Sequence, residues 1–236
     1  MSFGKYPFRE VIKHAFSREV WETLLPAVRD TLYMVALSAL ITLVLGVLLG
    51  IVLSVISKDG VRPVPVLNET AGTIVNCLRS LPQMIMIIVT LPLARMILGQ
   101  SYGVNACIIA LAASCIPMYA RLVQGAFVEI PKGKIEAAKA MGSSSAAIIF
   151  RVMLPEAVPS IIRGFTVALI GIISMTALAG SFGAGGIGDI AVRFGFNRFY
   201  HDMLIASVLV LIVMVEIAQL LGDLFSNLIL RKRHLI

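Results

Sequence analysis

The sequence predicts an all-α integral membrane protein with five transmembrane helices and a polar cytoplasmic segment between the third and the fourth. Its 236 residues are 58% apolar and only 14% charged, and the mean hydropathy is +0.95. Soluble domains contain about 45–50% apolar and about 25% charged residues. A chain of this length has no core large enough to bury so much apolar surface, so lipid must cover the remainder.

Each predicted membrane helix is a run of roughly 20 apolar residues, the length that a helix needs to cross the hydrocarbon core. In chain order the five runs are Thr31–Ser57, Leu81–Leu98, Val104–Ala120, Gly164–Ser181 and Met203–Gly222. Only the pentapeptide GQSYG separates the second run from the third, and its two glycines favour a tight turn.

Four charged residues lie in or beside these helices. Arg79, Arg95 and Arg121 are near predicted helix ends, where a long basic side chain can extend to the membrane surface. Glu216 lies deeper in its helix, and we expect it to pair with a basic residue of a neighbouring helix or to stay protonated. The three cysteines lie in apolar sequence without a C-x-x-C spacing, which favours small buried side chains over disulfides or metal ligands: Cys77, Cys107 and Cys115.

The basic residues predict the orientation of the chain, because Lys and Arg concentrate on the cytoplasmic side of a membrane protein. Several lie within 132–163 and the C-terminus reads RKRHLI, so both are expected in the cytoplasm. Five helices then put the N-terminus outside. The basic residues of segment 1–22 argue for the opposite side, but acidic residues are mixed with them. Its apolar residues lie near helical spacing and suggest an amphipathic helix at the outer interface: Val11, Ile12, Phe16 and Trp21.

This placement of basic residues also accounts for the net charge of +7, so no nucleic-acid partner is expected. The partner that the composition implies is membrane lipid.

The polar run KIEAAKAMGSSSAAIIFRVMLPEAVP begins at Lys134. Pro131 suits the first turn of a helix, and Glu136 would lie near the positive N-terminal end of that helix. Gly142 suits the left-handed residue that ends a helix, and the serines after it can cap the next one. The prolines of LPEAVP break the chain again. The run predicts two short cytoplasmic helices at an angle, and an ordinary solvated loop is the alternative.

This run resembles the EAA loop of ABC-importer permeases, in which Glu-Ala-Ala is followed at fixed spacings by Gly, Ile and Leu-Pro. The matching residues are Glu136, Ala137, Ala138, Gly142, Leu154 and Pro155, with Val152 in place of Ile. The resemblance implies an ABC type I importer permease fold, in which the loop is a coupling helix that docks into a groove on a separate ATPase. The small alanine side chains would let that partner approach closely.

Two further stretches, RSLP at 79–82 and GSFGAGGIG at 180–188, resemble permeases of methionine importers, as do the order and lengths of the helices. The resemblance implies a homodimer working by alternating access in the bacterial inner membrane, with two copies of a cytoplasmic ATPase and an extracytoplasmic substrate-binding lipoprotein. D- or L-methionine is the implied substrate, and another amino acid or small organic solute is the alternative. The resulting division is an interfacial segment 1–22, a transmembrane domain 23–230 with its coupling loop at about 131–155, and a basic cytoplasmic tail 231–236.

The resemblance also puts the end of the fourth helix at the axis of the dimer, where a gate is expected. Met175, Leu178 and Phe182 are three to four residues apart and would share one helix face. An apolar ring there would close the translocation path by excluding water. Ordinary helix packing is the alternative.

No catalytic, nucleotide-binding or metal-binding motif occurs, since G-x-x-x-x-G-K-[ST], H-E-x-x-H and G-x-S-x-G are all missing. We therefore expect no catalytic residue, metal or cofactor on this chain, and ATP with magnesium on the partner subunit. The glycines of 183–188 predict a bend at the outer end of the fourth helix, since no strand precedes them as in a dinucleotide site. An ion-gradient-driven secondary transporter is the other function class, but such proteins often show internal repeats and several buried ionisable groups.

Overall fold

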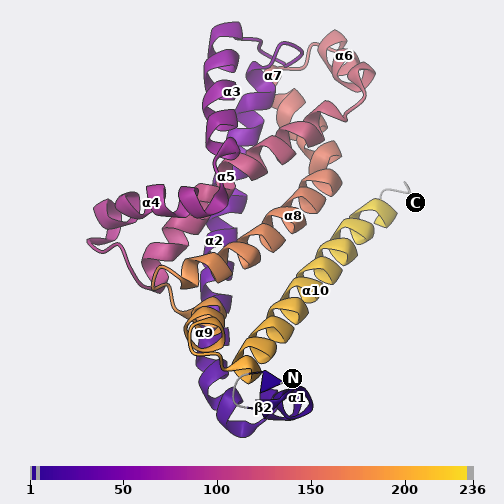
Figure 1. Ribbon diagram of the computed structural model, residues 1–236. Coiled ribbons are helices and arrows are strands. Elements are labelled where there is room, and N and C mark those ends of the chain that lie inside the picture. The colour runs from indigo at the N-terminus through magenta and orange to yellow at the C-terminus, as the bar shows by residue number, and fades with distance from the viewer. Residues whose placement is uncertain (1, 4–5, 233–236) are drawn as a thin grey trace. The chain divides into compact units, whose positions relative to one another are not determined.

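A computed structural model describes residues 2–3 and 6–232, so most of the predicted basic tail lies outside the described residues. The described chain is helical except for two short antiparallel strands, β1 (Ser2–Phe3) and β2 (Tyr6–Pro7) (Figure 1). The helices are α1 (Phe8–Ala15), α2 (Arg18–Ile56), α3 (Pro65–Ser80), α4 (Gln83–Leu98), α5 (Val104–Val128), α6 (Lys132–Ala140), α7 (Ser145–Ala147), η1 (Ile148–Met153), α8 (Leu154–Gly180), α9 (Gly186–Ile190), η2 (Ala191–Phe196) and α10 (His201–Lys232). The predicted all-α class is confirmed.

Among the described residues, four helical segments are long and apolar enough to cross a membrane: α2, α5, the run Ser145–Gly180 and α10. A fifth span exists if α3 and α4 count as one, because they form a pair bent by 113° at the break between them. The predicted second span is therefore not a straight helix. Its apolar residues form α4, whose 16 residues rise only about 24 Å at ~1.5 Å per residue, less than the thickness of the hydrocarbon core.

The bend between α3 and α4 has a local cause in the sequence. Leu81 takes an extended conformation (φ −72°, ψ 138°), as expected for a residue that precedes a proline. Pro82 then stands directly before α4 with φ −55°, close to the value that the proline ring fixes. At the other end of α4, Gly99 and Gly103 both have positive φ, so GQSYG is the tight turn that the sequence predicts.

The chain packs into two compact units, and each is made of separate chain segments. Unit 1 contains Met1–Leu40, Pro82–Ser114 and Leu169–Ala218, and unit 2 contains Ile41–Leu81, Cys115–Ala168 and Gln219–Ile236. In unit 1, buried residues of α1, α2, α9 and α10 form an apolar cluster: Ala15, Val20, Leu24, Ala27, Ile190 and Ala206. The N-terminal helix therefore packs into unit 1 through Ala15. The predicted interfacial segment 1–22 thus contains α1 and the first residues of α2, which begins at Arg18.

The glycine-rich bend after α8 lies in unit 1 and brings α9 against α8. A Cβ atom on Gly180 would stand 2.2 Å from the backbone nitrogen of Asp189, and one on Gly188 would stand 2.5 Å from the Cα of Ala177. Only glycine permits so close a backbone approach. The backbone N–H of Ile187 donates to the hydroxyl of Thr31 at 2.9 Å, which attaches α9 to α2. The predicted bend is confirmed.

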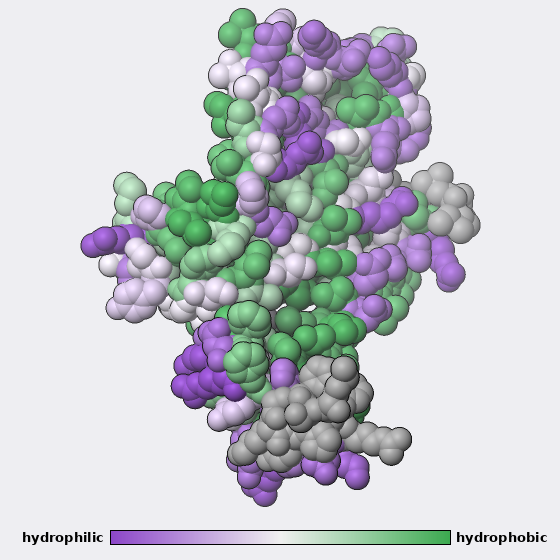
Figure 2. Space-filling view, in the orientation of Figure 1, coloured by the Kyte–Doolittle hydropathy of each residue, from purple (hydrophilic) through white to green (hydrophobic). Residues whose placement is uncertain are grey.

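In unit 2, α2 and α5 also approach closely at a glycine. A Cβ atom on Gly50 would meet the side chain of Val123 at 2.6 Å and the carbonyl oxygen of Ala120 at 2.8 Å. Tyr119, fully buried in the same helix, packs edge-on against Phe165 of α8 with ring centroids 5.7 Å apart. Figure 2 shows hydrophilic residues gathered over α6 and α7, at one end of this unit.

The cysteines agree with the sequence prediction in part. All three are free thiols; Cys107 and Cys115 are buried, whereas Cys77 is exposed. Within residues 2–3 and 6–232 no group of three or more His, Cys, Asp or Glu side chains could hold a metal ion.

Candidate functional site

The predicted coupling segment begins with α6, one residue later than the sequence suggests. Pro131 (φ −56°, ψ 122°) is the residue before the helix rather than its first member. The prediction that Glu136 lies at the positive end of α6 is also wrong, since the first turn holds no acidic residue and Glu136 is the fifth residue of nine. Its carboxylate is therefore too far from the free N–H groups for a strong interaction with the helix dipole.

The C-terminal end of α6 is determined by Gly142, as predicted. Gly142 has φ 74°, in the left-handed region that favours glycine. Its N–H donates to the carbonyl of Lys139 at 2.9 Å, and the N–H of Ser143 donates to the carbonyl of Ala138 at 3.1 Å. This pair of bonds is the Schellman motif, which satisfies the last carbonyl groups of a helix.

The next helix begins with the predicted serine cap. The Ser144 hydroxyl accepts from the backbone N–H of Ala147 at 3.3 Å. The predicted break at LPEAVP is wrong, because the chain stays helical from Ser145 to Gly180. A wider π-helical turn over Ile148–Met153 comes directly before Pro155, which cannot donate to the carbonyl four residues earlier. The wide turn accommodates the proline ring, and the helix continues.

Side-chain bonds within unit 2 hold this polar segment to its surroundings. Lys132 pairs with Asp59 at 3.0 Å, next to the end of α2, and Lys134 pairs with Glu156 at the start of α8. The Arg62 guanidinium donates to the Ser145 hydroxyl at 3.3 Å. Exposed ion pairs contribute at most about 1 kcal/mol each, so these bonds set the orientation of α6 more than its stability.

One face of α6 is open to solvent and could receive a partner protein. Glu136, Ala137 and Ala140 are exposed, whereas Ala138 is buried and faces the chain. Two large apolar side chains of the same polar segment are also exposed, Met141 (78%) at the end of α6 and Phe150 (62%) on η1. The sequence prediction missed both, although a methionine and a phenylalanine in a polar segment are a signal for a protein-binding surface.

Leu154 and Pro155, the last residues of the matched pattern, are half-buried in the first turn of α8. They lie next to the wide turn rather than on the open face of α6. Of the six predicted coupling residues, Glu136 and Ala137 are thus on the exposed surface of α6, and Gly142 shapes the end of that helix.

The three predicted gate residues do not share one surface of the chain. Met175 is 2% exposed within a single chain, whereas Leu178, one turn later on α8, is 37% exposed. Phe182 is half-buried and lies beyond Gly180, in the turn that follows the helix. Leu178 is therefore the predicted gate residue most available to a second copy of the chain.

Sequence comparison assigns the family. The family of binding-protein-dependent transport system inner membrane components matches residues 43–234. The chain belongs to this family.

Its relatives include transport permeases and a solved transporter. A probable D-methionine transport system permease protein from Vibrio cholerae is 39% identical over 86% of this chain and 90% of its own length. The methionine import system permease protein of Bacillus subtilis is 39% identical over 73% of this chain and 78% of its own. A structure of the MetNI methionine ABC transporter in an inward-facing conformation matches with a TM-score of 0.88 at 32% identity, over 91% of this chain and 99% of that one.

Family membership makes the protein a multi-pass inner membrane permease with the fold of an ABC importer subunit. A component of this kind is not the catalytic subunit of its transporter and carries no cofactor. The coupling segment lies within the matched residues 43–234, and so do the predicted gate residues.

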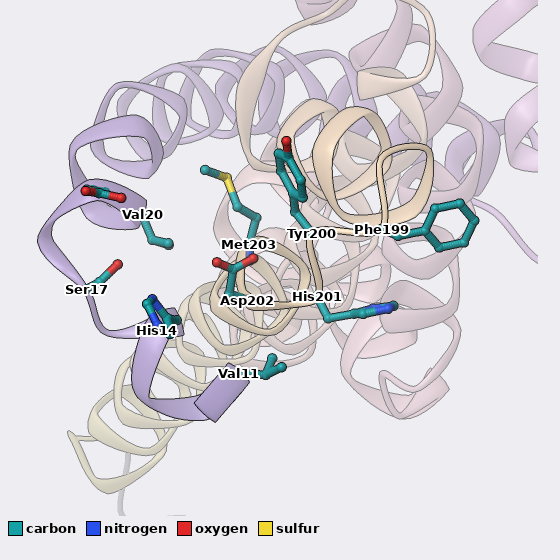
Figure 3. Close-up of a pocket in the computed structure, with 10 residues that line it drawn as sticks. Val11, His14, Ser17, Val20, Phe199, Tyr200, His201, Asp202 and Met203 are labelled. Carbon is teal, nitrogen blue, oxygen red and sulfur yellow. The ribbon is translucent and has the colours of Figure 1, made fainter. Parts of the chain in front are cut away.

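A small polar pocket of about 210 Å³ lies in unit 1 where the turn between α1 and α2 meets the start of α10 (Figure 3). Its polar lining includes His14, Ser17, His201 and Asp202. Nothing in the sequence brings positions 14 and 201 together, so this pocket is visible only in the structure. Phe199, beside them, has φ 59°, which is uncommon for a residue other than glycine.

Proposed function

We propose that this protein is the membrane-spanning permease subunit of an ATP-driven importer for D- or L-methionine. The observation that carries the proposal is the combination of a capped, solvent-exposed α6 with relatives whose names describe methionine permeases. The inward-facing MetNI structure, which is that of a methionine ABC transporter, supports the same substrate. Import would proceed by alternating access through a homodimer, coupled to a separate ATPase.

The proposed partners follow from the family and the coupling segment. Two copies of a cytoplasmic ABC ATPase would each receive one α6, and an extracytoplasmic substrate-binding lipoprotein would deliver the substrate. The exposed residues of α6, with Met141 and Phe150 beside them, are the proposed contact surface. Burial of these two apolar side chains in a groove on the ATPase would contribute free energy in proportion to the area removed from water.

The proposed orientation puts the N-terminus outside and the C-terminus in the cytoplasm. It requires α3 and α4 to count as one bent span, which gives five crossings. The basic residues of α6 support it, because Lys132, Lys134 and Lys139 would then lie on the cytoplasmic side. The short helix α1 would lie at the outer interface.

The experiment is a comparison of Glu136→Lys with the unchanged protein, each purified with its ATPase and reconstituted with the binding protein. Glu136 is exposed and makes no ion pair among the described residues, so the change should leave folding intact within about 0.5 kcal/mol. We expect the Glu136→Lys permease to insert normally into the membrane. It should either no longer co-purify with its ATPase or co-purify without stimulated ATP hydrolysis. Glu136→Gln, which removes the charge without reversing it, is the matched control and should have a weaker effect.

Normal methionine uptake by Glu136→Lys, independent of ATP and dependent on an ion gradient, would instead identify a secondary transporter. Uptake of a different solute by the unchanged complex would keep the importer mechanism and overturn the substrate.

A further inference from the structure

Glu216 lies in the middle of α10 and within the predicted fifth membrane span, Met203–Gly222. It is 15 residues after His201 and seven before Asp223, which is about 22 Å and about 10 Å along the helix. A carboxylate at such depth is costly in lipid and is found almost always next to a partner or a water-filled cavity.

No partner for Glu216 occurs within the part of the chain that the structure describes. Its carboxylate makes no hydrogen bond or ion pair there, and the side chain is exposed on the surface of the single chain. Its neighbours one turn away on α10 are apolar except for Gln219: Ile212, Val213 and Leu220. The expectation that Glu216 pairs with a basic residue of a neighbouring helix is therefore not met within one chain.

Glu216 lines a groove of about 310 Å³ between α8 and α10 within unit 1. The rest of the lining is apolar except for Ser174: Ile173, Ala177, Val208, Leu211, Ile212 and Val215. A second groove, of about 420 Å³, runs along another face of α10 and has no charged residue in its lining. Of these two grooves, only the one between α8 and α10 has a charged residue in its lining.

The two polar residues of the first groove can both accept hydrogen bonds. An ionised carboxylate only accepts hydrogen bonds. The Ser174 hydroxyl donates its one hydrogen to the carbonyl of Ile170 at 3.0 Å, which leaves its oxygen as an acceptor. No Lys or Arg lines the groove. Such a site is complementary to a cation with several N–H donors attached to an apolar body.

We propose that Glu216 and Ser174 form a subsite for the α-ammonium group of the transported amino acid, whose apolar side chain lies along Ile173 and Val208. This inference rests on the proposed import of methionine, and it adds a site within the membrane that recognises one end of the substrate. Because the lining has no cation, the subsite recognises the ammonium group and not the carboxylate.

The test uses the complete permease–ATPase complex in lipid nanodiscs without the binding protein, so that only the membrane site selects the ligand. Ala177, half-buried in the groove lining, is changed to Cys in a Cys77→Ser background and labelled with a cationic methanethiosulfonate reagent. We expect labelling to be slowed by methionine and by methionine amide, which keep the ammonium group. The des-amino compound 4-(methylthio)butanoate should give no protection.

The variants Glu216→Gln and Ser174→Ala should weaken the protection by methionine. In Glu216→Gln the methionine concentration that protects the cysteine should rise by about tenfold or more, and Glu216→Asp should restore part of the protection. Asp223→Asn removes a carboxylate from the same helix seven residues away and should change nothing. Equal protection by the des-amino compound would overturn the proposal, as would full protection in Glu216→Gln. Failure of the reagent to label the cysteine at position 177 would overturn it too, since the groove would then be closed to water.

A transport assay separates this inference from the proposed function. If the unchanged complex imports no methionine with its binding protein, the proposed function is wrong. If the unchanged complex imports methionine and Glu216→Gln imports it equally fast, only the ammonium subsite is wrong. If Glu216→Gln fails to assemble, the ammonium subsite is still tested by comparing methionine amide with the des-amino compound on the Ala177→Cys protein.

Discussion

The Arg121 guanidinium donates a hydrogen bond to the backbone carbonyl of Gly72 at 2.7 Å and a second to the side-chain oxygen of Gln124 at 2.6 Å. The first bond joins α5 to the middle of α3 within unit 2. The sequence suggested that Arg121 extends to the membrane surface, but the side chain is half-buried and bonded to the protein instead. Its length lets it reach a neighbouring helix as easily as the lipid headgroups.

We expect Arg121→Met to destabilise the protein by about 1.5–3 kcal/mol, the range for hydrogen bonds to charged groups. The change removes the bond that joins α5 to the Gly72 carbonyl of α3, and thermal unfolding in detergent should show a lower Tm. Arg95→Met is the matched control, since Arg95 is exposed and makes no side-chain hydrogen bond among the described residues. Equal shifts in the two variants would mean that the bond to Gly72 adds nothing.

Gly142→Val should uncouple transport from ATP hydrolysis without preventing folding. A β-branched residue at φ 74° strains the backbone by about 1–3 kcal/mol and should displace the end of α6. Gly133→Val, inside α6 with open space around it, is the control for added bulk. The measurement is methionine-stimulated ATPase activity of the reconstituted complex. Equal activity in both variants would contradict a special role for the end of α6.

Leu178→Ser should increase leak or basal ATPase activity if Leu178 belongs to an apolar gate. A hydroxyl group in a narrow apolar constriction favours its wetting. Leu93→Ser, at an exposed position on α4, is the control. Both variants are compared in proteoliposomes by the release of preloaded methionine. If neither leak nor basal ATPase activity changes at normal expression, another residue forms the gate.

Cysteine labelling of intact cells should establish the orientation. In a Cys77→Ser background, a cysteine replacing Lys13 on α1 should react with a membrane-impermeant reagent, and one replacing Lys139 on α6 should react only after lysis. Both residues are exposed, so burial does not limit the reaction. Protection at position 13 with reaction at position 139 would mean that the chain is inverted. Protection at both positions in intact cells would indicate four crossings instead of five.

Gly50→Ala should lower stability by about 1–3 kcal/mol, because overpacking forces α2 away from α5. Gly171→Ala is the matched control, since a Cβ atom there meets no other atom within 4 Å and alanine favours helix. Chemical denaturation in detergent measures the free energy of unfolding of both variants. A stable Gly50→Ala protein would show that Val123 can move aside at no cost.

The sequence predicted the features that depend on local chemistry. The apolar runs, the left-handed Gly142, the Ser144 cap and the glycine-rich bend all follow from preferences of a few neighbouring residues. The missed features depend on contacts between distant segments or on compensation within a helix. The π-helical turn before Pro155 is an example, because a proline-rich sequence does not indicate whether the helix will break or the preceding turn will widen.

The predicted site was incomplete for the same reason. The motif located α6, but the exposure of Met141 and the burial of Met175 depend on how the helices pack. That Glu216 makes no ion pair among the described residues also became visible only in three dimensions. A spacing of three to four residues grouped Met175 with Phe182, although the helix ends between them at Gly180.

The Schellman end of α6 is specified almost entirely by residues 138–143, with Ser144 starting the next helix from its own hydroxyl. A turn whose geometry is encoded in so few adjacent residues is transferable. Residues 131–147 can be grafted into another importer permease without redesign of its membrane core, provided that Asp59, Arg62 and Glu156 are carried across as the three anchoring side chains. If α6 is the ATPase contact proposed above, we expect the recipient to acquire the ATPase preference of the donor, with its substrate unchanged.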